Sequence, residues 1–474
     1  MKLYHFYFIA SLSLIVLSGC TLGPDYRQPE LELTNEWSNA QKQLIEESNA
    51  EFWWHTFDDE QLNSLIAQSD ANNLELHIAL GRIEQSRALR AYASGENMPS
   101  VDAVGSYTRS RSSGNSIAAV PGEHSIYSTG FDAFWEADVF GRIKRSIESA
   151  QATLEQSIAD YDSLKVSLRA EVARNYIELR TAQARIERAK ENIEIQKQAL
   201  ELTQNRFEAD VAPKLDVAQA RLNLANTQSE IPSLRISETE AINRLAVLIG
   251  KSPNALRKQL LISKPLPQLN NEPAAGLPAE LLRRRPDISS AERALAAQTA
   301  LIGQAEAMRY PSFSLKGMLG FEATHISDLG NWDSKTFSFG PAVRWNIFDG
   351  NRLRSLVAVE EARTKQLASK YEATVLSAVE EVENAMVGYL QEKRRARALA
   401  RSVDAATQSV DMVETLYKNG LTNFQNVLDA QRSLSQQQDR LAVSQGLILQ
   451  KTIALYKAIG GGWQLEITDK QNEN

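Results

Sequence analysis

One long stretch of the sequence contains neither glycine nor proline, and it constrains the fold more than any other feature. It runs from Arg142 to Ala212, and its apolar residues recur about every 3.5 to 3.6 positions, the period of an amphipathic helix or a coiled-coil seam. A helix of roughly 65 residues would be ~100 Å long, far longer than the helices of ordinary compact domains. The stretch from Arg352 to Asn419 repeats the apolar pattern. The sequence therefore predicts two long helical rods in one chain.

Composition and motifs exclude several classes of function. Charged residues make up 23% of the chain and the net charge is −7, without a long basic or acidic block. There is no basic stripe with interleaved aromatic residues, so nucleic-acid binding is not expected. The five histidines are scattered without zinc-ligand spacing, and no catalytic constellation stands out. We therefore expect no enzyme activity, no cofactor and no metal site.

The N-terminus has the form of a secretory signal. Lys2 precedes an apolar segment, Phe6 to Leu17, which is too short to span a membrane. The sequence Leu17-Ser18-Gly19-Cys20 then resembles a bacterial lipobox, in which cleavage leaves Cys20 as a lipidated first residue. Cys20 is the only cysteine, so it cannot form an intramolecular disulfide. The other interpretation is an ordinary signal peptide with an incidental cysteine. Thr21 follows instead of aspartate, which by the sorting rule for such lipoproteins favours the outer membrane.

Two pairs of segments have a period of two instead of 3.6. Residues 101–111 and 127–139 form the first pair, and residues 313–322 and 337–347 form the second. Apolar residues occupy one side of each segment and polar residues the other. Charged residues of the polar side include Asp132, Glu136, Asp138, Lys316 and Arg344.

Alternation of this kind over about 11 to 13 residues is typical of transmembrane β-strands. The other interpretation is a set of half-buried strands in a soluble sandwich. Four strands cannot close a barrel, and an open edge is not viable in lipid. Chains must therefore combine: two copies give eight strands filled by side chains, whereas three give twelve and leave room for water. These charged residues suit the lumen of such a twelve-stranded barrel.

The order of elements occurs twice along the chain, which indicates an internal duplication. Each half contains a helix, a strand pair, a rod and a returning helix. At a fixed offset, Val217, Ala220 and Leu224 match Val427, Ala430 and Leu434. We divide the chain into a signal peptide (1–19), an extended segment (20–58), a first efflux-type repeat (59–250), a linker (251–280), a second repeat (281–462) and a tail (463–474).

Several motifs in a fixed order resemble the TolC family of outer-membrane efflux ducts, specifically the lipoprotein branch of the OprM and CusC type. They are Cys20 to Tyr26 (CTLGPDY), Leu281 to Ile288 (LLRRRPDI), Glu380 to Ala385 (EEVENA), Val427 to Arg432 (VLDAQR) and Leu455 to Trp463 (LYKAIGGGW). The resemblance covers essentially the whole chain. It implies an internally duplicated α+β membrane protein that forms a homotrimer. Its twelve-stranded β-barrel, with four strands per chain, would continue into a long α-helical periplasmic tunnel.

The resemblance also implies partners and sites. A periplasmic adaptor would dock on the tips between the long helices, and an inner-membrane pump would drive transport. The tips are Asp210, Val211, Ala212 and Pro213 in the first repeat, and Gly420, Leu421 and Thr422 in the second. Both are also plain tight turns between antiparallel helices. Tyr417, Asp429 and Arg432 match positions that line or latch the periplasmic gate, although Asp429 and Arg432 are also spaced to pair along one helix.

Together these features predict the outer-membrane exit duct of a tripartite efflux system, anchored in outer-membrane lipid through Cys20 and extending into the periplasm. Such a duct is passive, because the energy enters at the pump. The alternatives are a lipid-anchored periplasmic scaffold without a channel, or a duct dedicated to metal cations. The chain has six methionines and no Met/His cluster, which favours drugs or metabolites as cargo.

Overall fold

The computed structural model describes residues 21–29, 51–113, 115, 122–270, 273 and 285–463. The predicted signal peptide (1–19), Cys20, residues 30–50 of the predicted extended segment and the predicted tail from residue 464 lie outside these described residues. The helices are α2 (Glu60–Asn72), α3 (Leu74–Gly95), α4 (Arg142–Glu208), α5 (Lys214–Leu248), α6 (Arg257–Leu260), α8 (Pro286–Ala307), α9 (Arg352–Lys418) and α10 (Phe424–Ala458). The strands are β1 (Ser100–Ser112), β2 (Gly122–Ala137), β3 (Ser312–Ala323) and β4 (Lys335–Arg344). Short 3-10 turns are η2 (Trp53–Phe57), η3 (Pro253–Leu256), η4 (Ile326–Asp328) and η5 (Trp332–Ser334).

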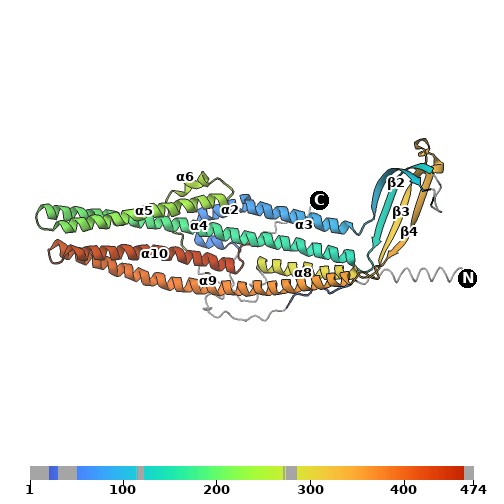
Figure 1. Ribbon diagram of the computed structural model, residues 1–474. Coiled ribbons are helices and arrows are strands. Elements are labelled where there is room, and N and C mark those ends of the chain that lie inside the picture. The colour runs from blue at the N-terminus through green and yellow to red at the C-terminus, as the bar shows by residue number, and fades with distance from the viewer. Residues whose placement is uncertain are drawn as a thin grey trace. The chain divides into compact units, whose positions relative to one another are not determined.

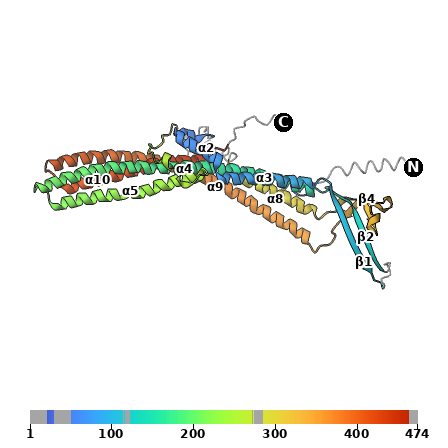
Figure 2. The same cartoon turned by 90° about the horizontal axis from the view of Figure 1, so that it is seen from above.

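The two predicted rods are confirmed as α4 and α9, which have 67 residues each. They begin at Arg142 and Arg352, 210 positions apart, and the returning helices α5 and α10 have 35 residues each. In Figures 1 and 2, α5 runs back along α4 and α10 runs back along α9. Pro232 lies inside α5, and the helix continues on both sides of it. The duplication therefore preserves the length of each long helix.

The chain folds into two compact units. The strand unit comprises the described residues within 1–30, 81–158 and 290–372, and it holds all four described strands. The hairpin unit comprises the described residues within 31–80, 159–289 and 373–474, and it holds both helical tips. Each unit therefore draws on both halves of the sequence. None of the helices among the described residues has a stretch long and apolar enough to cross a membrane.

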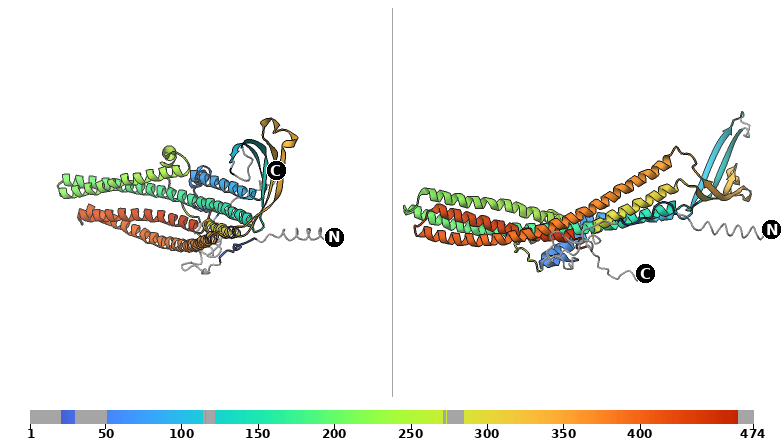
Figure 3. Two further views of the ribbon diagram at one scale, coloured as in Figure 1. Left: turned by 45° about the vertical axis from the view of Figure 1, so that its right-hand side comes forward. Right: turned by 90° about the horizontal axis from the view of Figure 1, so that it is seen from below.

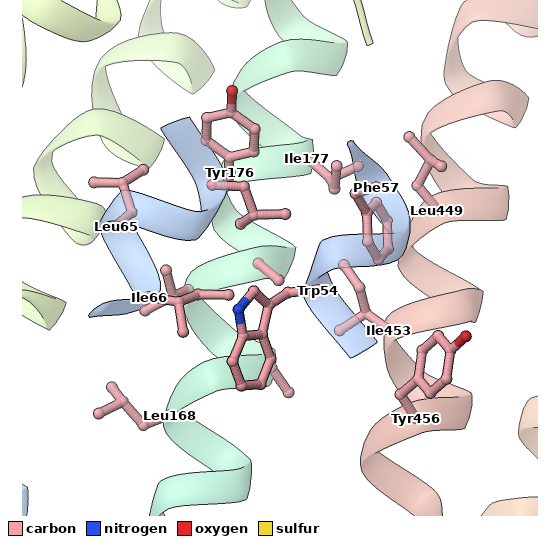
Figure 4. Packing of buried hydrophobic residues seen from close by; sticks show 14 of the residues in the cluster. Trp54, Phe57, Leu65, Ile66, Leu168, Tyr176, Ile177, Leu449, Ile453 and Tyr456 are labelled. Carbon is pink, nitrogen blue, oxygen red and sulfur yellow. The ribbon is translucent and has the colours of Figure 1, made fainter. Parts of the chain in front are cut away.

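The core of the hairpin unit is built around η2 and α2. Figure 4 shows Trp54, Phe57, Leu65 and Ile66 from this segment among side chains of α4 and α10. Trp53 is fully buried and stacks on Tyr456, with 5.5 Å between ring centroids. The short N-terminal segment thus joins the first rod to the last helix. Burial of each large aromatic side chain contributes about 1.5–3 kcal/mol to this core.

A buried arginine fastens the linker after α5 to the first rod. The guanidinium of Arg180 donates to Oε1 of Gln61 (2.6 Å), to Oε1 of Gln183 (2.5 Å) and to the carbonyl of Ile262 (3.1 Å). It also lies over the ring of Tyr176, 4.9 Å from its centroid. Removing such a group leaves several buried acceptors unpaired. The polar network therefore fixes the linker together with Leu256 and Leu260, which are buried in the same core.

The strand unit contains one antiparallel sheet in the order β1-β2-β3-β4. Figure 3 shows the first hairpin in blue to teal and the second in yellow to orange, side by side in this sheet. Val101 lies opposite Ala133, which lies opposite Gly317, which in turn lies opposite Phe339. Because directly opposed residues share a face, this register decides which side chains of the four strands lie together.

We predict that Trp53→Ala lowers the free energy of unfolding of the hairpin unit by about 3–5 kcal/mol, the usual cost of removing a buried aromatic side chain. Denaturant unfolding in detergent, followed by the helical circular dichroism signal, measures this. Phe52→Ala is the matched control, because Phe52 is the neighbouring aromatic residue and is exposed. Equal destabilisation by both substitutions would contradict a core built on Trp53.

Candidate functional sites

The sheet has one polar and one apolar face. Across all four strands, the register brings together the apolar residues Val101, Ala103 and Tyr107 of β1, Tyr127, Phe131, Ala133 and Trp135 of β2, Phe313, Leu315, Leu319 and Phe321 of β3, and Phe337, Phe339 and Val343 of β4. On the other face Asp132 lies opposite Asp102 on one side and Met318 on the other. Lys316 lies opposite Phe134, and Arg344 lies opposite Ser312. The four strands thus share the faces that their sequences predict.

The acidic end of β2 is tied to the start of the first rod. Glu136 accepts from the guanidinium of Arg142 at 3.0 and 3.2 Å, and Arg142 also lies 3.4 Å from Glu96. Burial lowers the pKa of Arg142, but the bonds and charge of Glu136 and Glu96 outweigh it and raise the pKa overall. Asp138 lies one residue past the end of β2, and its carboxylate accepts the backbone N–H of Lys144 at 2.7 Å. Asp138, which was predicted as a lumen residue, thus caps the N-terminus of α4.

One tryptophan in each strand pair, which the sequence analysis did not single out, ties the end of the second strand to the segment that precedes the first strand. The indole N–H of Trp135 donates to the carbonyl of Asn97, and that of Trp345 donates to the carbonyl of Arg309, both at 3.1 Å. Trp135 and Trp345 are 210 positions apart, and their acceptors are 212 apart. Their matching positions in the two repeats were the signal that could have identified them.

The two tips have the same backbone geometry despite different residues. Asp210 and Gly420 both adopt the left-handed conformation, with φ of 54° and 74°. The N–H of Val211 donates to the carbonyl of Arg206 at 2.8 Å, and the N–H of Leu421 donates to that of Leu416 at 2.9 Å. This is the Schellman pattern that ends a helix, in which glycine is usual. Aspartate tolerates the left-handed region better than most residues, so the first tip keeps the turn without glycine.

Each tip presents an apolar side chain to solvent. Val211 and Leu421 are exposed at the turns, and Leu215 is exposed on the first turn of α5. Ala212 and Pro213 complete the first turn, with Pro213 immediately before α5. At the second tip, Thr422 accepts from the amide of Asn426 at 2.8 Å. The hydroxyl and amide hold the start of α10 while leaving Leu421 free for contact.

Tyr417 is buried beside the second tip. Its ring lies 5.3 Å from that of Phe424, and the guanidinium of Arg206 lies 4.8 Å above it. Arg206 also donates to the carbonyls of Tyr417 and Lys418, at 3.3 and 3.5 Å. Burial raises the pKa of the Tyr417 phenol, while Arg206 counteracts this. Arg206, which the sequence analysis did not identify, therefore fastens the end of α9 to α4.

The ion pair between Arg432 and Asp429 along α10 is long. Nη1 of Arg432 lies 3.8 Å from Oδ1 of Asp429, and both side chains are exposed. Asp429 accepts from the amide of Gln425 at 3.0 Å. Nε of Arg432 donates to Oδ1 of Asn223 at 3.2 Å, so its shorter contact is with α5 and not along α10. The structure thus brings Arg432 to the first repeat, and leaves Asp429 at the surface of α10.

A sheet with one polar and one apolar face, followed in each half of the sequence by a long helical hairpin, is typical of a membrane channel with a helical extension. The family model described as outer membrane efflux protein matches residues 65–251 and 277–461. The chain therefore belongs to the outer membrane efflux protein family. The described residues contain no group of three His, Cys, Asp or Glu side chains that could hold a metal ion.

Relatives and solved structures agree with this family. The chain is 33% identical over 457 residues to nodulation protein T of Rhizobium leguminosarum bv. trifolii, covering 95% of this chain and 96% of that protein. It is 31% identical to the probable efflux pump outer membrane protein TtgC of Pseudomonas putida, covering 98% and 96%. The solved outer-membrane channel OprN has a TM-score of 0.90 at 36% identity, covering 94% of this chain and all of that one.

These matches confirm the predicted family, fold class and function. The chain is an outer-membrane efflux channel with the fold of the trimeric channels that have a helical tunnel. Its family is made up of channel proteins, and it is located at the outer membrane. The predicted lumen, tip, gate and lipid-anchor residues remain predictions.

We predict that Arg432→Ala and Asn223→Ala are coupled, because each removes one side of the same interhelical hydrogen bond. A double-mutant cycle on unfolding should give a coupling energy of about 0.5–1.5 kcal/mol. Asp429→Ala with Arg432→Ala is the matched comparison, and should give a coupling near zero since that ion pair is long and exposed. The reverse ranking would favour pairing along α10.

Proposed function

We propose that three copies of the chain join their sheets into one closed wall of twelve strands around a water-filled pore, and that the helical hairpins extend this pore as an exit duct for small organic molecules. The observation that supports this proposal is the separation of polar and apolar residues across all four strands. A polar face on one side and lipid-compatible residues on the other suit a pore wall. The unpaired backbone N–H and C=O groups of the edge strands find no water in lipid, so the sheet must close into a barrel.

In this proposal, the polar face lines the lumen. Asp132, Lys316 and Arg344 supply exposed charges, while Glu136 holds Arg142 at the base of the pore. Asp138 contributes by capping α4, and its charge adds to the acidic rim. Asp102 and Asp132 lie opposite each other, so three copies carry six carboxylates at one level of the wall. Such a lumen attracts cations more than anions.

The two tips are the proposed docking sites for a periplasmic adaptor, which connects the duct to an inner-membrane pump. The support is their common geometry: two left-handed turns present Val211 and Leu421 to solvent at matching positions. Paired exposed apolar residues on rigid turns suit a recurring protein contact. Three copies would offer six such tips to the adaptor.

Tyr417, Asp429 and Arg432 are the proposed gate residues at the same end of the helices. The support is their position around the junction of the two hairpins, where Arg432 contacts Asn223 and Tyr417 packs under Arg206. Release of either contact would let one hairpin move relative to the other. In this proposal Asp429 faces the constriction as a charged surface group.

The proposed lipid anchor is Cys20, which becomes the first residue when the signal peptide is cleaved after Gly19. Its support comes from the residues that follow. Arg145 is buried and donates to the carbonyls of Leu22 and Gly23, and to Asp25 at 2.8 Å. Gly23 packs so closely that an added Cβ would lie 2.3 Å from the Cα of Gly303. This tight seat would hold an acylated N-terminus against the strand unit.

The proposed cargo is organic and not metallic. A toluene efflux pump protein and an antibiotic efflux pump protein of Pseudomonas putida are each 31% identical to the chain over 472 residues, and 98% of this chain is covered. A cation efflux system protein of Escherichia coli is 28% identical. The stronger likeness is to proteins named for organic molecules. The alternative function, a scaffold without a pore, would give no conductance across a bilayer.

We predict that the reconstituted protein gives discrete, cation-preferring conductance in planar bilayers, and that Asp132→Asn lowers the cation-to-anion permeability ratio roughly twofold. Three copies then lose three charges that act on ions within a Debye length of ~8–10 Å. Reversal potentials in a salt gradient measure the ratio. Asp333→Asn is the control, because Asp333 is exposed and lies in η5, outside the strands. A bilayer that stays tight would favour the scaffold.

We also predict that Leu421→Asp weakens adaptor binding about tenfold, which corresponds to ~1.4 kcal/mol. A charge replaces an apolar group that docking would bury. Affinity is measured with purified adaptor, and conductance is measured in parallel to confirm an intact pore. Leu261→Asp is the control, because Leu261 is also an exposed leucine but follows α6 and belongs to neither tip. Unchanged affinity with Leu421→Asp would contradict docking at the tips.

A further inference from the structure

The apolar face of the sheet ends in basic residues where the strands of each hairpin join. The helices α3, α4, α8 and α9 connect to the sheet at its other end. Along β1, the face that carries Tyr107 continues with Arg109 and Arg111. Along β4, the face that carries Phe337 begins with Lys335. We call Arg109, Arg111 and Lys335 the basic rim.

The opposite face of the sheet carries no cation at this end of β1 and β4. Thr108 and Ser110 alternate with the two arginines on β1, and Thr336 follows Lys335 on β4. In the proposed pore wall this opposite face meets water, where a charge would be fully solvated. The cations lie instead on the face toward lipid, where a charged side chain is tolerated only near the interface with water. Solvation alone therefore does not explain the side of the sheet on which they lie.

Aromatic side chains lie next to the basic rim on both hairpins. On the first hairpin, the rings of Tyr107 and Tyr127 lie 4.7 Å apart, and Tyr107 is 54% exposed. On the second, Nζ of Lys335 lies 4.4 Å from the ring centroid of Trp332, which is 76% exposed. Tyrosine and tryptophan are enriched where a membrane meets water. The aromatic residues therefore place the basic rim at the level of the lipid headgroups.

The strands neutralise only part of the charge of the basic rim. Glu123 lies directly opposite Arg111, but its carboxylate accepts from Arg109 at 2.6 Å. Both side chains of this ion pair are more than half exposed, and an exposed pair contributes little to stability. Arg109 can therefore exchange Glu123 for another anion. Three cations against this one carboxylate leave an excess of positive charge, although the net charge of the chain is −7.

We propose that the basic rim binds the phosphorylated sugar headgroup of a lipid in the outer leaflet. The inference rests on the proposed function, in which the helices extend into the periplasm and this end of the sheet faces the exterior. Arg109 and Arg111 are two residues apart on one face, about 7 Å, and guanidinium groups match phosphate oxygens in paired hydrogen bonds. Beside them, the hydroxyls of Tyr107 and Ser125 lie 3.3 Å apart and suit the hydroxyls of a sugar. Lys335 adds a point charge on the second hairpin.

Native mass spectrometry of the full-length protein in detergent, titrated with diphosphoryl lipid A, tests this site. The variant with Arg109→Gln and Arg111→Gln should bind the lipid at least about tenfold more weakly, because it loses charge-assisted hydrogen bonds to phosphate. Lys335→Gln should weaken binding about threefold, the scale of one exposed ion pair. The matched control carries Arg257→Gln and Lys258→Gln, which remove two charges from exposed residues of α6, outside the sheet. This control should bind the lipid as the unmodified protein does.

Two competitors identify what the basic rim recognises. Phosphatidylglycerol is an anionic lipid without a sugar, and inorganic phosphate has no lipid part, so neither should displace lipid A at equal concentration. Displacement by either one would overturn the proposal, as would an equal loss of affinity in the control.

Conductance is a separate measurement on the same proteins. Unchanged lipid A binding by the double variant of Arg109 and Arg111, in a protein that still conducts, would overturn the lipid site alone. If the double variant does not assemble, Lys335→Gln decides by the same measurement, and unchanged binding would again overturn the site. An unmodified protein that binds lipid A but does not conduct would instead contradict the proposed function.

Discussion

Unpaired backbone groups are the constraint on which the rest of this structure depends. Each N–H or C=O left without a partner in hydrocarbon costs several kcal/mol, since no water is present to replace the hydrogen bond. A sheet of four strands leaves one row of such groups on β1 and another on β4. No rearrangement within one chain removes both rows. The closed wall is therefore a property of the assembly, and the chain alone supplies one segment of it.

Much of the fold could be predicted from local sequence because its elements are unusually regular. The absence of glycine and proline marked the first rod, the repeated apolar pattern marked the second, and α4 begins at the expected Arg142. Alternation assigned Asp132, Lys316 and Arg344 to one face before any register was known, and the observed pairing keeps them there. The period of the apolar residues and the positions of glycine and proline determine such features residue by residue. The fold class followed because few architectures accommodate these elements together.

Contacts between distant segments could not be predicted in the same way. Arg432 was expected to pair with Asp429 or to act at a gate, yet its shorter bond is to Asn223, more than two hundred residues away. Asp138 alternates correctly with its neighbours but lies beyond the strand, where it caps α4. Both outcomes depend on how a helix is rotated or where a strand ends. Those details are set by packing, and a single periodic pattern carries little information about them.

The duplication explains why the two halves are similar in shape but not in chemistry. Helix lengths and the left-handed tips are preserved, whereas the fasteners between hairpins occur once. Arg185 binds Asp439 at 2.6 Å, but 210 positions away the matching residues are Arg395 and Ser229. Likewise the position matching Arg432 is Leu222, which is exposed.

A chain built from two repeats around an axis has two kinds of junction. The inner junction, where the two helical hairpins of one chain meet, forms as the chain folds, so charged groups such as Arg185 and Asp439 can be paired there in one cooperative step. The outer junction, where two copies meet, must remain compatible with water until another copy arrives. Burial of apolar side chains there then stabilises the association. Selection on these two junctions differs, so the repeats have diverged at their contacts while keeping the backbone that both contacts require.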